Sequence, residues 1–342
     1  MTHGSTCANR EQTFDKAPSV VAGQRRCHLV LVPNEPTNQV EDFLRIAELV
    51  KQHDPKIKTT VVTDRYAGMA RMATYATLPT LMLSFVPLAR YKPLRGRFIQ
   101  GIHLSKSQEY KQLEKAGFAV PKWQIIEKGQ ALDPAEFGSY VVTKPDIGQR
   151  GALVKIKRTK RVGFSSKTKT VHSGRYAPSV KEDGVMLAQR FIYTGQWPVC
   201  YRVATLFGKA LYSFKAQASR DRAQLSGPEA FGNMEGTSGV SIVASGRGCR
   251  ITMNDDDEVI RFAEAAHSAF PDSPLLGFDI VREVPSGKLY ILEANSVGYV
   301  WHFSSPMGTS MQQDNGICFE DQFNGIQKAA LILAEKTREL AQ

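Results

Sequence analysis

The segment from Gly277 to Asn295 constrains the fold more than any other part of the chain. Two apolar runs flank the tripeptide Pro285-Ser286-Gly287, and this pattern predicts a β-hairpin whose turn is centred on the middle residue of the tripeptide. Such a turn places Asp279 directly opposite Glu293, and cross-strand neighbours have Cβ atoms roughly 4.5–5.5 Å apart. Asn295 lies two residues beyond Glu293 and therefore shares its face of the sheet.

Two carboxylates that face each other in an apolar sheet repel each other, and burial adds the cost of removing them from water. They therefore need a proton or a cation between them. Two carboxylates and an amide oxygen form a hard donor set that suits Mg²⁺, usually together with phosphates and water. An exposed hairpin with ordinary polar residues is the alternative, and it is disfavoured by the apolar neighbours Phe278, Ile280, Leu292 and Ala294.

The N-terminal part of the chain alternates between strand and helix patterns. Residues 1 to about 25 are polar and aperiodic, and they are expected to form a disordered tail. Apolar runs predict strands at 27–33, 59–63, 80–86 and 98–102, and a helix at 38–51. This alternation predicts a small α/β domain with a mainly parallel sheet. No GxGxxG motif follows the first strand, so a dinucleotide site is not indicated.

The remaining two thirds of the chain are richer in strand patterns. Ser105 can cap a helix that Gly117 ends. Further helices are expected at 254–269 and 319–340. Strands are expected at 140–144, 152–156, 185–192, 199–207, 209–216, 275–284 and 288–294.

The net charge of +11 over 342 residues is concentrated in one segment. No Asp or Glu occurs between Asp146 and Glu182, a stretch that contains ten lysines and arginines. The segment is either a solvated basic surface or a region that binds polyanions such as nucleotide phosphates, an acidic substrate or nucleic acid.

Other compositional features exclude several classes of protein. The five cysteines are scattered and form no CxxC pair, which argues against a disulfide framework and against a zinc site. No apolar run approaches the roughly 18 residues of a membrane span, and the N-terminus lacks the apolar core of a secretory signal. These features predict a cytoplasmic protein without a membrane partner.

Two further patterns suit phosphate binding. The predicted strand from Tyr140 ends at Lys144 and enters a loop with Gly148 and Gly151, where backbone N–H groups can approach oxygen atoms closely. Arg202 and Lys215 would project from neighbouring strands of a second hairpin. Each pattern by itself is also found in ordinary hairpins and solvated sheet edges.

These motifs together resemble those of the ATP-grasp enzymes, above all the carboxylate–amine ligases, over roughly residues 28 to 340. Four motifs follow the order of that family: Ser105-Lys106 with the later Ala116-Gly117-Phe118-Ala119-Val120-Pro121, Lys144-Pro145 with its two glycines, the segment from Gln189 to Gln196, and Asp279 with Glu293-Ala294-Asn295-Ser296. The resemblance implies an α/β (α+β) fold in which two subdomains clasp ATP. Its parts would be a tail (1–25), a Rossmann-like pre-ATP-grasp domain (26–104), a central subdomain with a basic lid (105–185) and a C-terminal subdomain (186–342).

The resemblance also implies roles for individual residues. Lys106, Lys144 and Lys215 would contact the phosphates, and Arg202 would stabilise the transferring phosphoryl group. Gly148 and Gly151 would belong to the loop over the phosphates. The hinge that meets adenine and then ribose would be formed by Gln189, Arg190, Phe191, Ile192 and Gln196. One or two Mg²⁺ ions, for which Mn²⁺ can substitute, would be held by Asp279, Glu293 and Asn295.

The chain departs from the pattern at several positions. Gln196 replaces the common ribose-binding Glu, and Arg190 stands where an acidic residue is common. Gly277 occupies a position that is arginine in some of these ligases, so Arg202 competes with Arg220 and Arg222 for the role at the phosphoryl group. An aromatic segment replaces the Pro-Gly turn that often follows the metal-binding asparagine, and its residues Ser296, Trp301 and His302 are candidates for the acceptor site.

The function implied is ATP-dependent, ADP-forming amide or peptide ligation between a carboxylate and an amine, with small-molecule or peptide substrates that include acidic ones. A phosphotransferase built on the same nucleotide site is one alternative. A non-catalytic module that binds nucleotides or polyanions is the other, although a nucleic-acid partner is not favoured. The sequence leaves the oligomeric state open, and a homo-oligomer is compatible with it.

Overall fold

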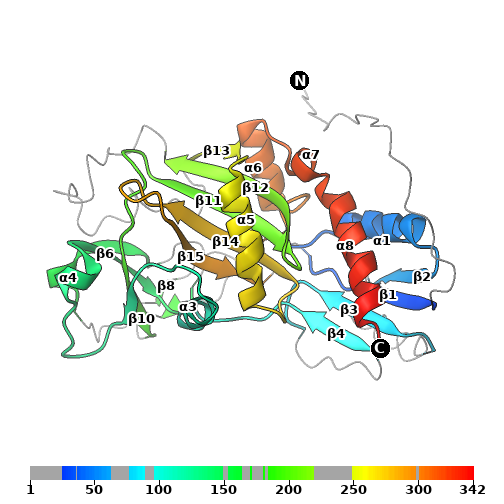
Figure 1. The fold of residues 1–342 in the computed structure, drawn as a ribbon, viewed down its shortest axis with the longest axis horizontal. Coiled ribbons are helices and arrows are strands. Elements are labelled where there is room, and N and C mark those ends of the chain that lie inside the picture. Colours follow the sequence, from blue (N-terminus) through cyan, green and yellow to red (C-terminus); the bar gives the residue numbers. More distant parts are fainter. Residues whose placement is uncertain are drawn as a thin grey trace.

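The computed structural model describes residues 25–35, 37–62, 77–88, 96–148, 153–163, 170–171, 180–181, 184–218, 249–297 and 300–342. These residues form a mixed α/β structure with three main sheets arranged along the long axis of the molecule (Figure 1). The sheet formed by the C-terminal strands lies between the other two. The expected α/β (α+β) class is therefore confirmed.

The N-terminal sheet is wholly parallel and has the order β2-β1-β3-β4. Its strands are β1 (Cys27–Leu31), β2 (Ile57–Val61), β3 (Thr80–Ser84) and β4 (Arg97–Gln100). The two central strands, β1 and β3, are buried along their whole length, as expected for parallel strands covered on both faces. Helix α1 (Val40–His53) packs against helix α8 (Gly325–Leu340) beside this sheet.

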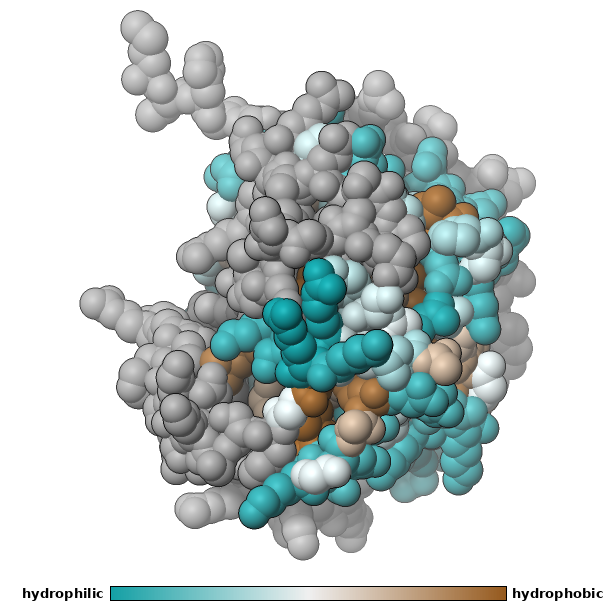
Figure 2. All heavy atoms as spheres, turned by 90° about the vertical axis from the view of Figure 1, so that its left-hand side faces the viewer, coloured by the Kyte–Doolittle hydropathy of each residue, from teal (hydrophilic) through white to brown (hydrophobic). Residues whose placement is uncertain are grey.

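The second sheet lies at one end of the molecule (Figure 1) and is called the central sheet only because its strands lie in the middle of the sequence; it is antiparallel and has the order β5-β10-β6-β7. Its strands are β5 (Trp123–Ile125), β6 (Tyr140–Pro145), β7 (Lys155–Arg158) and β10 (Met186–Arg190). Helix α4 (Pro134–Phe137) and the 3-10 turn η1 (Thr159–Arg161) pack beside it, and β8 (Thr170–Val171) pairs with β9 (Val180–Lys181). The described surface of this end of the molecule is mostly hydrophilic, with small hydrophobic patches (Figure 2).

The C-terminal sheet is antiparallel and has the order β13-β12-β11-β14-β15. Its strands are β11 (Val199–Leu206), β12 (Lys209–Ala218), β13 (Cys249–Met253), β14 (Leu275–Arg282) and β15 (Leu289–Asn295). Helix α5 (Asp257–Ala266), extended by η2 (His267–Ala269), packs on β11 and β12, and α3 (Lys106–Lys115) packs on β15.

The C-terminal helices join the N-terminal sheet to the C-terminal sheet. Helices α6 (Pro306–Asn315) and α7 (Phe319–Phe323) lie beside β13 and β12. Helix α8 contacts β12 and also β1 and β3, so one continuous hydrophobic core runs from the N-terminal sheet to the C-terminal sheet. The end of the chain therefore holds two distant parts of the sequence together.

Most predicted elements are present, with some differences. The helix expected at 319–340 is divided at Asn324, whose left-handed backbone (φ 49°, ψ 51°) separates α7 from α8. The sequence patterns did not predict β5, α4, β8, β9, β13 or α6. Helix α6 has a weak apolar pattern, but Ser305 at its N-cap and Pro306 at its first position are start signals that were overlooked. Among the described helices, none is both long and apolar enough to cross a bilayer.

Candidate active site

The predicted hairpin has the expected register at its two acidic residues. Asp279 on β14 pairs with Glu293 on β15, and Gly277 pairs with Asn295. On the other side of β14, Asp279 pairs with Arg202 of β11. Three charged side chains from three adjacent strands therefore lie in one row on one face of the sheet.

Arg202 binds Asp279 through two hydrogen bonds. Its Nε donates to Oδ1 at 2.6 Å, and a terminal nitrogen donates to Oδ2 at 2.8 Å. Burial raises the pKa of Asp279, and the guanidinium opposes this rise. Burial also lowers the pKa of Arg202, but the Asp279 carboxylate outweighs it and the net shift is upward. The two residues form a charge-assisted, two-point ion pair.

Gly277 has no room for a side chain. A Cβ atom on it would lie 2.8 Å from Cγ2 and 3.0 Å from Cγ1 of Val300. Val300 is itself held, because the hydroxyl of Tyr212 donates a hydrogen bond to its carbonyl oxygen. An arginine at position 277 would therefore require Val300 to move, and the guanidinium at Asp279 comes instead from the neighbouring strand, at Arg202.

Lys106 is the cationic partner of Glu293. Its ammonium group lies 3.2 Å from a carboxylate oxygen of Glu293 and donates a hydrogen bond of 2.9 Å to the carbonyl oxygen of Gly148. Burial lowers the pKa of Lys106, but Glu293 and Glu109 outweigh it, so the pKa is raised. Burial likewise raises the pKa of Glu293, but Lys106 and Lys144 outweigh it, so that pKa is lowered. Both shifts favour the charged forms.

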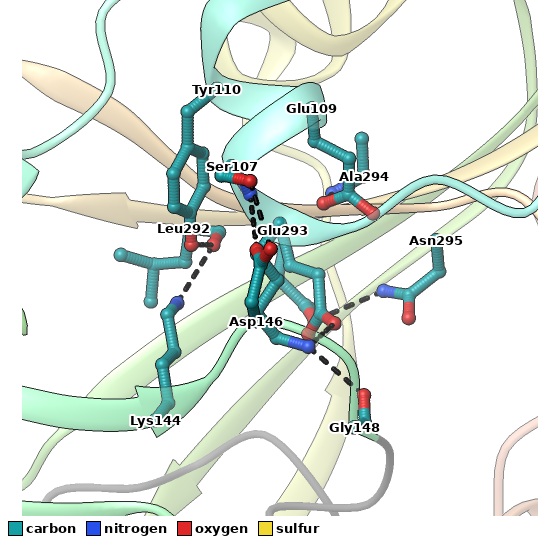
Figure 3. Close-up of polar contacts among 12 residues, drawn as sticks. Ser107, Glu109, Tyr110, Lys144, Asp146, Gly148, Leu292, Glu293, Ala294 and Asn295 are labelled. Atoms are coloured by element: carbon teal, nitrogen blue, oxygen red, sulfur yellow. Dashed lines mark hydrogen bonds and ion pairs between the residues drawn. The ribbon is translucent and has the colours of Figure 1, made fainter. Parts of the chain in front are cut away.

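Lys144 links the central sheet to the C-terminal sheet. Its ammonium group donates to the carbonyl oxygen of Leu292 at 3.2 Å and lies 5.3 Å from the centre of the Tyr110 ring. The Tyr110 hydroxyl donates to the same carbonyl at 2.8 Å (Figure 3). Burial lowers the pKa of Lys144 to about 8. The side chain reaches this position because β6 ends beside β15.

Ser107, Glu109 and Asp146 also lie around these lysines, and the sequence patterns did not indicate a role for them. Ser107 donates its backbone N–H and its hydroxyl to the two carboxylate oxygens of Asp146, at 2.7 and 2.9 Å (Figure 3). Glu109 accepts a hydrogen bond of 3.1 Å from the backbone of Ala294, and burial raises its pKa well above the ordinary value. The sequence did contain a signal for Glu109, because Glu109 and Tyr110 lie three and four residues after Lys106 and therefore share its helix face.

The predicted hinge follows β10. The Gln189 side chain shares a sheet face with Lys144. Leu187 is the partner of Lys144, and Gln189 lies two residues after Leu187 on the same strand. Gln189 is 2% exposed, and its Nε2 makes no hydrogen bond of standard geometry among the described residues, although the side chain lies close enough to the Tyr110 hydroxyl to oppose the rise that burial causes in the pKa of that group. An amide nitrogen carries two N–H donors, so this side chain retains donor capacity for an external acceptor.

The other hinge residues occupy three kinds of environment. Arg190 forms an ion pair with Glu283 at the hairpin turn. Phe191 packs against the cluster formed by Tyr140 and Ile156. Ile192 is buried, and Gln196 is exposed. The arginine that departs from the family pattern therefore connects the central sheet to the C-terminal sheet.

Lys215 is not brought to this site, which corrects the expected phosphate contact. It pairs with Tyr201, whereas Arg202 pairs with Phe214, so Lys215 and Arg202 lie on opposite faces. An irregularity in the pairing between Ala204 and Thr205 causes this. Next to the turn, Leu206 pairs with Lys209 and Thr205 pairs with Ala210. If this register continued, Arg202 would pair with Ser213, and Lys215 would lie on the same face as Arg202. One extra residue in β12 instead moves Lys215 to the opposite face.

The aromatic segment after Asn295 is largely structural, which corrects the expectation for Trp301. Its side chain is 0% exposed, packs against Phe85 with ring centres 5.1 Å apart, and donates its N–H to Asp42 at 2.7 Å. Ser296 is buried and donates to the carbonyl oxygen of Ile102. His302 is buried near Arg202, and burial lowers its pKa to about 3. Gly151, Arg220 and Arg222 lie outside the described residues, as do residues 149–152, 164–169 and 172–179 of the basic segment.

No protein-family model matches the chain, and no curated protein matches its sequence. Solved structures that align with it include a D-alanine–D-alanine ligase from Bacillus anthracis, at 14% identity and a TM-score of 0.43, over 91% of this chain and 99% of that one. The D-cycloserine synthetase DcsG aligns over the same shares at 14% identity and a TM-score of 0.46. The ATP-grasp ligase PsnB in complex with a minimal precursor aligns at 12% identity and a TM-score of 0.45, over 89% of this chain and 99% of that one. At these values the function of the chain has to be argued from its own residues.

Proposed function

We propose that the chain is an ATP-dependent carboxylate–amine ligase of the ATP-grasp type. One observation carries the proposal: the cations Lys106, Lys144 and Arg202 converge with Asp279 and Glu293 at one buried site. These residues come from a helix, the central sheet and the C-terminal sheet. A cluster of fixed cations beside oxygen ligands is the arrangement that phosphoryl transfer requires, because its transition state is stabilised mainly by positioning and charge.

The central sheet and the C-terminal sheet would bind ATP between them. The boundary between the two subdomains, expected at 185/186, would lie after Arg190, because β10 pairs with strands of the central sheet. Lys106 and Lys144 would hold the phosphates, beside the loop that begins at Gly148. The side-chain amide of Gln189 would hydrogen-bond adenine, together with the backbone of Arg190 and Ile192, and Gln196 would hold the ribose. The aromatic and aliphatic side chains around Phe191 supply an apolar wall, as small-molecule sites usually have.

The oxygen atoms of Asp279, Glu293 and Asn295 lie on one sheet face and are of the kind that suits Mg²⁺, but Arg202 already binds Asp279 at two points, so Glu293 and Asn295 would be the principal ligands. Mn²⁺ would suit the same ligands. The ion would supply positive charge that neutralises the phosphate oxygens. The lysines would orient the γ-phosphate for attack by the carboxylate of an amino acid, small molecule or peptide, giving an acyl phosphate and ADP. An amine then attacks the acyl carbon, phosphate leaves, and the amine loses a proton.

The decisive experiment counts nucleotide and phosphate. The purified protein is incubated with ATP, Mg²⁺ and pools of amino acids, peptides and acidic metabolites, and ADP, AMP and free phosphate are quantified together. Equal amounts of ADP and free phosphate that depend on a carboxylate and an amine are expected. ADP without free phosphate would instead identify a phosphotransferase. Nucleotide binding without any turnover would indicate a binding module.

Glu293→Gln should abolish this turnover, because the amide cannot carry the negative charge that holds the cation. The matched control is Glu258→Gln, a change of the same chemistry on α5, where the partner Arg282 lies outside the proposed site. Circular dichroism checks that both variants fold. Turnover retained by Glu293→Gln would refute the metal assignment.

A further inference from the structure

The two carboxylates of the site have cationic partners of different kinds. Asp279 is bound by the fork of the Arg202 guanidinium, whereas Glu293 is bound by the single ammonium group of Lys106. A guanidinium is planar and holds a carboxylate at two points, while an ammonium group on a flexible stem acts as a movable point charge. The two carboxylates therefore differ in how readily they can accept a metal ion.

Asp279 has little capacity left for a metal. A carboxylate offers about four lone-pair positions. Arg202 occupies two of them at 2.6 and 2.8 Å, and the Asn295 amide donates to Oδ2 at 3.4 Å. That amide also donates to the carbonyl oxygen of Gly277 at 3.2 Å. Both of its partners only accept hydrogen bonds, so the nitrogen of Asn295 faces Asp279 and its oxygen remains for another cation.

Arg202 is held in place by its surroundings. Its side chain is only 13% exposed and lies beside Phe214, the residue opposite it on β12. In the described part of the chain, Asp279 is the only carboxylate with which Arg202 forms an ion pair. A divalent ion at Asp279 would lie next to a fixed positive charge, and the two would repel each other strongly in a buried site.

Glu293 is the carboxylate that can be released. Its side chain is 23% exposed, and its partner Lys106 also donates to the carbonyl oxygen of Gly148. When phosphates are present, the ammonium group can exchange Glu293 for a phosphate oxygen without leaving a charge unpaired. Glu293 then becomes available to a divalent ion that arrives with the nucleotide.

We infer that this site takes one divalent cation per nucleotide, held by Glu293 and the oxygen of Asn295, and that the guanidinium of Arg202 occupies the place beside Asp279 where a second ion would bind. The inference rests on the proposed function and specifies how positive charge is distributed in its site. Arg202 supplies one charge permanently, and the metal supplies the other only when nucleotide is bound.

The test is a count of bound ions on the full chain. The protein is dialysed against a non-hydrolysable ATP analogue and Mn²⁺, and bound analogue is measured in the same cell in which electron paramagnetic resonance measures free Mn²⁺. One Mn²⁺ per bound nucleotide is expected at saturation. Two Mn²⁺ per bound nucleotide would overturn the inference while leaving the proposed function intact. Failure to bind the analogue at all would overturn the proposed function itself.

A variant pair tests the role of Arg202. Arg202→Met frees Asp279 and should raise the count from one Mn²⁺ to two, because the carboxylate then needs a new cation. Arg282→Met is the matched control, since Arg282 lies on the same sheet but pairs with Asp256 and Glu258. Its count should stay at one. A count that remains at one in folded Arg202→Met would refute the proposed role, and if that variant does not fold, the wild-type count still decides.

Discussion

A single glycine determines which strand supplies the arginine of the site. Gly277 lies opposite Asn295 and against Val300, so the strand that carries Asp279 cannot also carry a large side chain two residues earlier. The adjacent strand supplies Arg202 to the same carboxylate. The chemistry at Asp279 therefore depends on a steric condition at a residue that carries no chemistry itself.

Gly277→Ala tests this condition. The added Cβ would overlap Val300, and overpacking of this kind costs about 1–3 kcal/mol of unfolding free energy. When Val300 is already alanine, adding Gly277→Ala should lower the unfolding free energy by less than it does in the wild-type chain, because the overlap is removed. Chemical denaturation of the three variants gives the coupling energy. Strictly additive effects would show that the two residues do not compete for space.

Among the elements, helix α3 supplies Lys106 and Glu109 to the site, and Asp146 fixes the position of its first turn. That carboxylate accepts two hydrogen bonds from Ser107, and its backbone carbonyl accepts one of 3.0 Å from Lys106. The start of α3 is thereby attached to the end of β6. Since Lys106 and Glu109 follow within one turn, this attachment sets where both charges lie.

Asp146→Ala should reduce stability by about 1–2 kcal/mol, as loss of an N-terminal helix cap does, and should also weaken binding of an ATP analogue. Asp133→Ala is the matched control, because Asp133 caps the short helix α4 through a hydrogen bond of 2.9 Å to Ala135. It should affect stability alone. Equal nucleotide affinity in both variants would show that the attachment of α3 does not position Lys106.

His267, in the turn that ends α5, makes stability depend on pH. It is buried, contacts the hydroxyl of Thr205 at 2.7 Å and the carbonyl of Ser273 at 2.9 Å, and burial lowers its pKa to about 4 from 6.5. The folded state therefore binds fewer protons than the unfolded state at acidic pH. Its contribution is complete above pH 6.5 and is lost as the pH falls from 6.5 towards 4.

Between pH 7 and pH 5 this residue should account for a loss of about 2 kcal/mol in unfolding free energy. His267→Gln keeps a polar side chain but cannot be protonated, so its stability should fall less over that interval. Urea denaturation at the two pH values measures the difference. His28 and His302 also have lowered pKa values, so part of the acid sensitivity should remain in the variant. Parallel losses in both proteins would rule out a contribution from His267.

Across the whole molecule, the C-terminal helix α8 and the residues after it are attached to α1 and to the N-terminal sheet. Arg338 on α8 donates two hydrogen bonds of 2.7 Å to Asp54 at the end of α1, and the backbone of Thr80 on β3 donates to the carbonyl of Gln342. Because α8 also packs on β12, these contacts connect the N-terminal sheet to the sheet that holds the site.

Arg338→Met should lower the unfolding free energy by about 1.5–3 kcal/mol, the usual value for hydrogen bonds to a charged group. Lys336→Met is the control on the same helix, since Lys336 forms a local ion pair with Glu339 and lies 5.9 Å from the centre of the Phe207 ring, and neither contact involves α1. Such a pair contributes at most about 1 kcal/mol. Chemical denaturation compares the two variants, and equal stabilities would show that the link between α1 and α8 contributes little.

The sequence by itself determined the local elements and one long hairpin. Alternating strand and helix patterns predicted the parallel N-terminal sheet, and the turn signal at Pro285-Ser286-Gly287 predicted the hairpin. These predictions succeeded because turn chemistry and side-chain periodicity depend on residues close together in the chain. The pairing of Asp279 with Glu293 also depends on an irregularity between Asp279 and Ile280, because the register nearer the turn would otherwise place Asp279 opposite Leu292.

Tertiary structure alone decided which groups those carboxylates meet. Arg202 and Lys106 are far from Asp279 and Glu293 in the sequence, and no local pattern specifies their pairing. The same holds for Lys215, which an extra residue in the pairing of β11 and β12 turns to the other face. The packing of distant elements sets such contacts, and one residue of register exchanges every side chain between the two faces of a sheet.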